Sequence, residues 1–306
     1  MTNDITLNEF ESKARNWLDA NAQKKPDVSD KEAEWGEGEF SVAVFHNLTF
    51  EEERDLLQEA AEWQIAKSKE GYHAITWPTQ YGGLDLPIEF ARAFARLESD
   101  YITPSRHETF SVTTRLIAPT VLHYGTDDQK EELLSDLFSA RIYCCQLFSE
   151  PGTGSDLAGL GCKAVKDGDE WVINGQKVWS SGAQFSQWGE LIARTHFDQP
   201  KHKGMTAFII PMDLPGIEIR QIRQMSGGTS FNEVFFSDVR VPDNLRLGPE
   251  GEGWGVALTT LSFERDHSDS DGGGRAGGKW SQLLDTAKSL DLLQDPQIRQ
   301  RLMEVY

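Results

Sequence analysis

The sequence predicts an α+β protein with several domains, in the order helical, β and helical. Before residue 140, apolar side chains recur at the spacing of helix faces, as in "LNEFESKARNWLDANA". From Arg141 to about Leu247 the runs are short and alternating, with β-branched and aromatic residues between turn formers. Helical patterns return after "GPEGEGWGVA". We therefore expect an all-α domain over 1–140, a middle β domain over 141–248 and the beginning of a second α domain over 249–306.

Capping residues mark the ends of the expected helices. Thr49 precedes three glutamates and suits an N-cap, and Gly71 suits the end of the helix that follows. Near the end of the sequence, Asp295 and Pro296 suit the N-cap and first position of another helix. Further helices are predicted over 89–97, 113–123, the stretch "GTDDQKEELLSDLFSA", "LTTLSFERD" and "WSQLLDTAKSLDLL".

The strand signals lie in the middle region. Asn174 and Gly175 separate two strand-like runs in "EWVINGQKVW", which is a strong short-range hairpin signal. Further strands are predicted over 188–196, 204–212 and 232–242. Together these segments predict a compact antiparallel β domain of roughly a hundred residues.

Composition excludes several classes of function. The net charge of −19 disfavours nucleic acid and anionic membranes as partners. No apolar run approaches the roughly 20 residues that span a bilayer, and "MTNDITLNEF" resembles neither a secretory signal nor a transit peptide. Three cysteines, two of them adjacent, provide neither a disulfide framework nor metal-ligand spacing. We expect a cytoplasmic protein without a metal site.

The loop "FSEPGTGSDL", from Phe148 to Leu157, has more small residues and accessible backbone N–H groups than a simple connection needs. It is not a Walker loop, because no Gly-Lys-Ser/Thr follows, and it lacks the GxGxxG of dinucleotide-binding folds. Two interpretations remain, a structural turn and a loop that wraps a bulky ligand rich in acceptors.

The flanking motifs favour the second interpretation. "YCCQLFSEPGTGSDLAGLGCKAVKDGDEWVINGQKVWSSGAQFSQW", "SFNEVFFSDVRVPDNLRLGPEGEGW" and "ITWPTQYGGLDLPIEFARAFARLE" resemble motifs of the acyl-CoA dehydrogenases in order and spacing. The resemblance covers nearly all of the chain. It implies an FAD-dependent enzyme that removes a proton from Cα of an acyl-CoA while hydride leaves Cβ for flavin N5. It further implies that electrons pass to an electron-transfer flavoprotein.

The resemblance also assigns cofactor contacts. It places the loop around FAD, and small residues let backbone N–H groups approach phosphate and flavin oxygens closely. Trp179 could instead be a core aromatic and Ser181 merely the end of a strand. The expected FAD-binding residues are Gln146, Leu147, Phe148, Ser149, Gly154, Ser155, Trp179, Ser180 and Ser181.

Two further residues are candidates for chemistry and substrate binding. Glu264 in "TTLSFERDH" matches the position of the catalytic base in one group of the family, whereas most members carry that base further along the chain. Arg265 resembles the residue that helps to hold CoA, and Ser155 lies at the expected acyl-CoA side of the loop. The alternatives are a solvated glutamate and a plain surface arginine. The glycines of "SDSDGGGRAGGKW" should break the helix that lines the acyl pocket in the family.

Competing functions remain open at this point. The family has about four C-terminal helices, and this sequence contains only their beginning, so the chain is either a fragment or relies on a partner. We expect a homo- or hetero-oligomer. The alternatives to a dehydrogenase are a catalytically silent subunit or fragment that acts by association, and a flavin oxidase or monooxygenase on the same fold.

Overall fold

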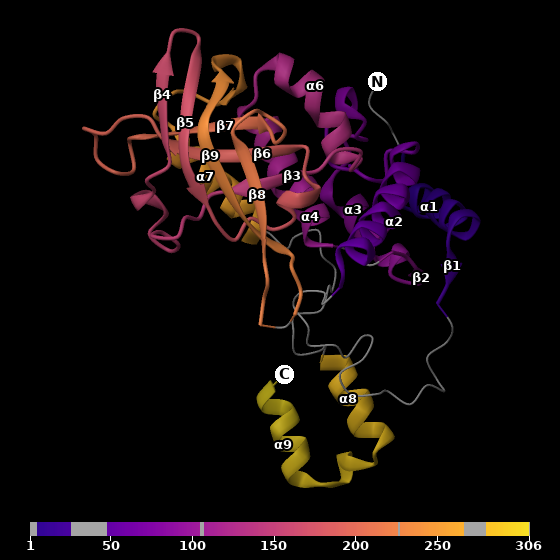
Figure 1. The fold of residues 1–306 in the computed structure, drawn as a ribbon. Coiled ribbons are helices and arrows are strands. Elements are labelled where there is room, and N and C mark those ends of the chain that lie inside the picture. Colours follow the sequence, from indigo (N-terminus) through magenta and orange to yellow (C-terminus); the bar gives the residue numbers. More distant parts are fainter. Residues whose placement is uncertain (1–4, 26–47, 105–106, 226, 266–279, 306) are drawn as a thin grey trace.

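The structure, a computed structural model, describes residues 5–25, 48–104, 107–225, 227–265 and 280–305. Figure 1 shows helices α1–α3 beside a twisted sheet, with α4, β3 and α7 close to the region where the two parts meet. The glycine-rich stretch after Arg265, where a break in the helix was predicted, lies outside the described residues. The α+β architecture predicted from the sequence is confirmed.

The N-terminal part is helical, as predicted. Its first helix begins with a capping box in which Thr6 accepts from the Glu9 N–H, and Phe10, Ala14 and Leu18 are buried on one face. The helices are α1 (Leu7–Asn21), α2 (Phe50–Ser68), α3 (Ile88–Glu98), α4 (Glu108–Ser111), the π-helical segment η3 (Val112–Ile117), α5 (Ala118–Tyr124) and α6 (Asp127–Phe138).

The predicted capping residue Thr49 is confirmed. It forms a capping box with Glu52 at the start of α2, and Thr126 forms the same arrangement with Gln129 at the start of α6. The segment predicted as one helix over 113–123 is longer than expected, because α4, the π-helical segment and α5 continue one another from Glu108 to Tyr124.

The middle part is one sheet of eight strands in the order β10-β7-β6-β4-β5-β9-β8, with β3 pairing to β6. Its strands are β3 (Cys144–Leu147), β4 (Lys163–Asp167), β5 (Glu170–Lys177), β6 (Trp188–Arg194), β7 (Met205–Pro211), β8 (Ile217–Ile222), β9 (Phe231–Pro242) and β10 (Arg246–Leu247). A short pair, β1 (Gln23–Lys24) and β2 (Tyr101–Ile102), lies among the helices.

The sheet is largely antiparallel, as predicted, but two of its strand pairs are parallel. Strand β3 runs parallel to β6 along its length, from Cys144 opposite Trp188 to Leu147 opposite Leu191. Strand β4 also meets β6 in parallel. Parallel neighbours need a long crossover, and the segment that contains the FSEPGTGSDL loop and the β4–β5 pair provides it.

The prediction of a hairpin at Asn174-Gly175 was wrong. Both residues lie inside β5, which continues to Lys177 and pairs with β9 through an irregularity between Ile173 and Gly175. Gly175 is required there for another reason: a Cβ would lie 2.7 Å from Cα of Cys162. The turn between paired strands lies earlier, where Gly168 adopts φ 64° between β4 and β5.

A shared core joins the helical part to the sheet. Ile117 and Leu134 of the helices, Cys144 and Ile209 of the sheet, and Val256 of α7 belong to one buried cluster. Helix α7 (Gly253–Arg265) therefore packs between the two parts. Burial of this continuous apolar surface fixes the helical part relative to the sheet. It therefore also fixes the residues on the two sides of any site between these parts.

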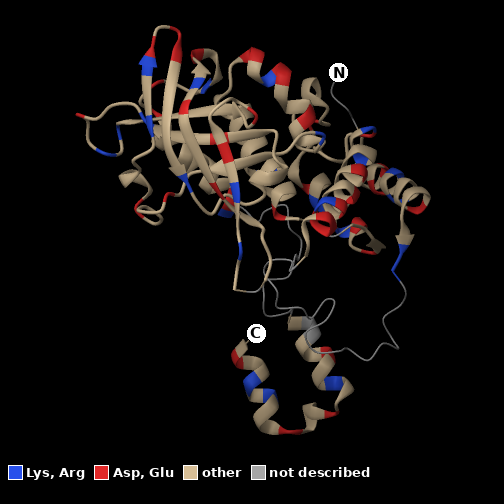
Figure 2. Cartoon of the chain, in the orientation of Figure 1, with Lys and Arg blue, Asp and Glu red and all other residues tan. Residues whose placement is uncertain are grey.

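The last described helices are α8 (Trp280–Ser289) and α9 (Pro296–Val305), and Figure 1 shows them as a separate pair. The predicted cap is confirmed, since Oδ1 of Asp295 accepts from the Gln297 N–H at 2.8 Å. Figure 2 shows Asp and Glu residues in red on the helices and on the sheet alike. Within the described ranges, every helix is too short or too polar to cross a membrane.

Candidate functional site

The FSEPGTGSDL loop is built around the carboxylate of Glu150. Its oxygens accept from the N–H groups of Gly161 at 2.6 Å and Cys162 at 2.9 Å, and from Nζ of Lys177 at 2.8 Å. The same Lys177 ammonium, which is fully buried, donates to the carbonyl of Phe148 at 2.9 Å. The buried Lys177–Glu150 pair therefore holds the backbone at Phe148, where the loop begins, and at Gly161 and Cys162, just after it ends. These charge-assisted hydrogen bonds fix the backbone between those points.

The outer side of this loop is open. A Cβ built at Gly152 or Gly154 would meet no atom within 4 Å, and Ser155 is exposed. Oγ1 of Thr153 is buried yet has no hydrogen-bond partner among the described residues. These glycines are therefore not demanded by packing within the chain, and the open space beside them can accept a ligand.

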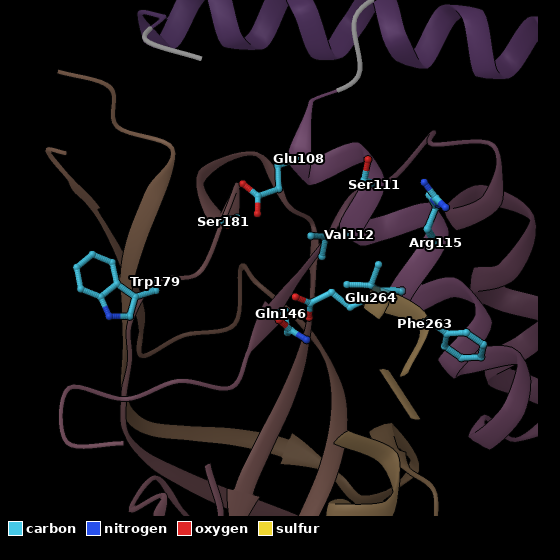
Figure 3. A pocket seen from close by; sticks show the side chains of 10 residues that line it. Glu108, Ser111, Val112, Arg115, Gln146, Trp179, Ser181, Phe263 and Glu264 are labelled. Atoms are coloured by element: carbon cyan, nitrogen blue, oxygen red, sulfur yellow. The ribbon is translucent and has the colours of Figure 1, made fainter. Parts of the chain in front are cut away.

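A cavity of about 230 Å³ lies where the helices, β3 and α7 meet. Figure 3 shows the carboxylate of Glu264 beside the amide of Gln146, with Trp179 on one side and the helix of Arg115 on the other. The residues that line it are Glu108, Ser111, Val112, Arg115, Leu116, Gln146, Trp179, Ser181, Phe263 and Glu264.

Trp179 has a backbone conformation that a bulky residue rarely adopts. Its φ is 61°, which costs of order 1–3 kcal/mol and persists only where the surroundings enforce it. The flanking backbone is held on both sides, because Val178 N–H donates to the Ser149 carbonyl and Ser180 N–H to the Asn232 carbonyl. The residue as a whole is 57% exposed. Trp179 is therefore not a core aromatic, and its strained backbone presents an apolar face to the cavity.

The structure separates the predicted site residues into two groups. Gln146, Trp179, Ser181 and Glu264 line the cavity. The others predicted to bind cofactor or substrate do not line it, and they are Leu147, Phe148, Ser149, Gly154, Ser155, Ser180 and Arg265.

The side chains in the second group have different environments. Leu147 and Phe148 are buried in core clusters, so only their backbone groups remain for a ligand. Ser180 is buried as well, and its hydroxyl has no hydrogen-bond partner within the described chain. Ser155 lies on the open loop, and Arg265 is exposed at the end of α7.

Sequence reasoning missed the helical wall of the cavity. Glu108, Ser111 and Arg115 enter it from α4 and the π-helical segment. Their three- and four-residue spacing, which places all three on one helix face, was the available signal. π-helical turns are frequent at functional sites, but no residue pattern identifies one beforehand.

Electrostatics distinguish Glu108 from an ordinary surface carboxyl. Burial raises the pKa of the Glu108 carboxyl, a hydrogen bond with Ser181 opposes that shift, and the negative charge of Glu264 adds to it. Oε2 of Glu108 is buried with no hydrogen-bond partner in the described ranges. The cavity is therefore lined by the desolvated carboxyl group of Glu108 and the exposed carboxyl group of Glu264.

A buried network holds the start of α4, and with it Glu108. The Thr109 N–H donates to Nδ1 of His107 at 3.2 Å, and Nε2 lies 3.6 Å from Oε1 of Glu53. Since Nδ1 accepts, Nε2 carries the hydrogen and faces this carboxylate. Oγ of Ser230 donates to the same oxygen at 2.7 Å. These contacts connect helix α2, the start of α4 and Ser230, the residue directly before β9, on the buried side of the site.

A second buried carboxyl lies under α7. Oε1 of Glu190 accepts from the Thr260 hydroxyl at 2.7 Å, one helical turn before Glu264, and burial raises the pKa of Glu190 to about 8. Glu190 is the β6 partner of Gln146 in the parallel register. It therefore connects the strand that carries Gln146 to the helix that carries Glu264.

We expect Glu190 to make the folded chain less stable as pH rises. Between its ordinary pKa of 4.5 and the folded value of about 8, the native state binds the extra proton. The free energy of unfolding should then fall by about 1.4 kcal/mol per pH unit through that window. Glu190→Gln removes this dependence, so urea unfolding at pH 5 to 8 should show a flatter profile for the variant. Parallel profiles for the two proteins would show that Glu190 ionises normally.

Comparison with known proteins identifies the family. Residues 41–141 match "Acyl-CoA dehydrogenase, N-terminal domain" and residues 145–239 match "Acyl-CoA dehydrogenase, middle domain". The chain is 34% identical over 310 residues to acyl-CoA dehydrogenase IpdE1 of Mycolicibacterium smegmatis, covering 98% of this chain and 75% of the relative. The chain belongs to the acyl-CoA dehydrogenase family. The relatives that it matches are named acyl-CoA dehydrogenases, which are oxidoreductases.

Other relatives give the same result. The chain is 37% identical over 254 residues to IpdE1 of Mycobacterium tuberculosis, covering 83% of this chain and 66% of the relative. The solved structure "Tcur3481-Tcur3483 steroid ACAD" has a TM-score of 0.69 and 26% identity over 98% of this chain and 71% of that one. The ChsE4-ChsE5 complex from M. tuberculosis has a TM-score of 0.61 and 25% identity over 95% and 76%.

Proposed function

We propose that this chain is a subunit of an FAD-dependent acyl-CoA dehydrogenase in which Glu264 removes the proton from Cα of the acyl-CoA. The cavity that gathers Gln146, Trp179, Ser181 and Glu264 carries the proposal, because it unites residues of three separate segments that the family resemblance assigns to one site. A carboxylate is the base this weakly acidic proton requires, and it must lie within reach of the substrate carbon.

The residues present fit FAD. Nε2 of Gln146 is a buried donor without a hydrogen-bond partner in the described chain, and it faces the cavity. Trp179 offers an exposed aromatic face, and the space beside Gly152 and Gly154 is open to a phosphate. When bound, FAD supplies the acceptor for the hydride that leaves Cβ. From there, the electrons would pass to an electron-transfer flavoprotein.

The residues of the chain then have separate tasks. A Glu264 carboxylate oxygen takes the Cα proton, while the Gln146 amide donates a hydrogen bond within the cavity. Trp179 and Phe263 are apolar walls that exclude water when a ligand is seated. Glu264 is exposed in the described chain, so the desolvation that would strengthen it as a base comes from the bound ligand and cofactor. We assign the contact with the CoA phosphates to Arg265, because its guanidinium is exposed at the end of α7 and suits phosphate recognition.

A second subunit is part of this proposal. Tcur3481-Tcur3483 and ChsE4-ChsE5 are named as two-chain assemblies. Helices α8 and α9 and the segment between them expose apolar side chains, namely Leu283, Leu290, Leu292, Met303 and Val305. Such faces suit a subunit interface. Sedimentation of the active, FAD-bound protein as a lone 306-residue chain would contradict this part.

Anaerobic titration with a panel of acyl-CoAs tests the reaction. Loss of the oxidised-flavin spectrum on addition of a thioester supports dehydrogenation. A protein that binds FAD but is reduced by none of the panel would instead be the catalytically silent subunit. Rapid reoxidation of the reduced protein in air would favour an oxidase.

The loop assignment makes a separate prediction. Ser155→Trp should fill the open space beside Gly154 and obstruct a bound phosphate, so the purified variant should lack flavin, while Ser155→Ala should keep it. The flavin-to-protein absorbance ratio measures this directly. Stoichiometric flavin in the Trp variant would remove Ser155 from the cofactor site.

A further inference from the structure

The wall of the cavity contributed by the N-terminal helices is polar. Glu108, Ser111 and Arg115 line it from one side, interleaved with Val112 and Leu116. A cavity for an unsubstituted hydrocarbon chain is lined mainly by apolar side chains, with few polar groups placed to orient the ligand. Three polar side chains on a single wall therefore indicate that the bound group carries a polar atom on that side.

Glu108 is the member of this wall with unused hydrogen-bonding capacity. Its Oε2 atom is buried and has no partner among the residues described, although the atom belongs to a side chain that lines the cavity. A buried polar atom left without a partner is costly, and a ligand that supplies the partner recovers that cost on binding. Figure 3 shows the carboxyl group next to Ser181, on the same helical wall as Ser111 and Arg115.

We propose that Glu108 determines substrate specificity and that the acyl group it selects carries a hydroxyl group near the reacting carbons. This inference rests on the proposed function and names the substrate class of the same site. A hydroxyl both donates and accepts, so it pairs with a carboxyl group in either protonation state. Ser181, which the family resemblance places at the reactive edge of the flavin, is beside Glu108. The hydroxyl is therefore within a few bonds of Cα and Cβ.

A carboxylate-bearing acyl group fits this cavity less well. Arg115 offers a positive charge, but Glu108 and Glu264 both face the same space of about 230 Å³. The negative charges of Glu108 and Glu264 would repel a carboxylate on the acyl group bound in the same space. A neutral hydroxyl avoids that repulsion and still satisfies Oε2 of Glu108.

The test uses two matched ligands, cyclohexanecarboxyl-CoA and its trans-4-hydroxy derivative, whose geometry prevents lactone formation. Calorimetric binding to the full-length, FAD-loaded protein should favour the hydroxylated ligand by about tenfold or more, the range for one hydrogen bond to a buried carboxyl. The same preference should appear in kcat/KM for flavin reduction. Glu108→Leu should bring the ratio close to one, whereas Glu108→Gln should keep part of it, because an amide also donates and accepts.

The outcomes distinguish the proposed role of Glu108 from the proposed dehydrogenase function. Equal binding of the two ligands by the wild-type protein overturns the role of Glu108, and so does an unchanged preference in Glu108→Leu. The dehydrogenase function still stands in either case if cyclohexanecarboxyl-CoA bleaches the flavin. Binding of neither ligand overturns both. If Glu108→Leu does not fold, the wild-type ratio and the Gln variant decide the question.

Discussion

Glu264→Gln should slow flavin reduction by a bound acyl-CoA by about 10²–10⁴-fold, the usual loss when a general base is removed. Glutamine keeps the shape and hydrogen bonding of the side chain but cannot take a proton. Thioester affinity should change little, because Gln146, Trp179 and the loop remain in place. Single-turnover reduction under anaerobic conditions measures the chemical step separately from binding.

The matched control is Glu131→Gln on the exposed face of α6, which makes the same chemical change outside the cavity. Its reduction rate should equal that of the wild type. If Glu264→Gln also bleached at close to that rate, the base would have to be another group, and Glu264 would be only an exposed residue near the end of α7.

Lys177→Met should destabilise the chain by about 3–5 kcal/mol, the cost of leaving one partner of a buried ion pair uncompensated. Methionine has a similar length, but it cannot donate to Glu150 or to the Phe148 carbonyl. The carboxylate would keep only the two backbone donors of Gly161 and Cys162. Urea unfolding, followed at the middle domain, measures the loss, and the double variant with Glu150→Gln should recover part of it.

The same loop provides the control for this second prediction. Lys201 pairs with Asp156 at 2.7 Å, but the two side chains are 51% and 64% exposed. Exposed pairs are typically worth about 0–1 kcal/mol, because water screens them. Lys201→Met should therefore be nearly neutral. A similar loss in the two variants would mean that Lys177 contributes through general packing and not through its buried charge.

Local signals were sufficient for much of the helical part. Thr49 and Asp295 cap helices as predicted, because a side chain that accepts from a backbone N–H two or three residues later needs no information from elsewhere in the fold. The strand at Asn174-Gly175 shows the opposite case. The pair has the chemistry of a turn, yet the approach of Cys162 to Gly175 and pairing with β9 keep it extended.

The candidate site divides in the same way. Gln146, Trp179, Ser181 and Glu264 could be selected from the sequence, because each lies within a motif that resembles its counterpart in a known family. Glu108 lies outside the residues chosen for those motifs. It enters the site only because α4 packs against α2, where His107 faces Glu53.

The sequence by itself determined the family, the order of helical and β segments, and the loop whose small residues leave room for a ligand. These depend on residue identity and short-range spacing. Only the tertiary structure decided the mixed sheet, the desolvation of Glu190 and Glu108, and the polar wall opposite Glu264. Burial and parallel pairing arise when segments far apart in the chain exclude water from one another, and no local pattern specifies which segments will meet.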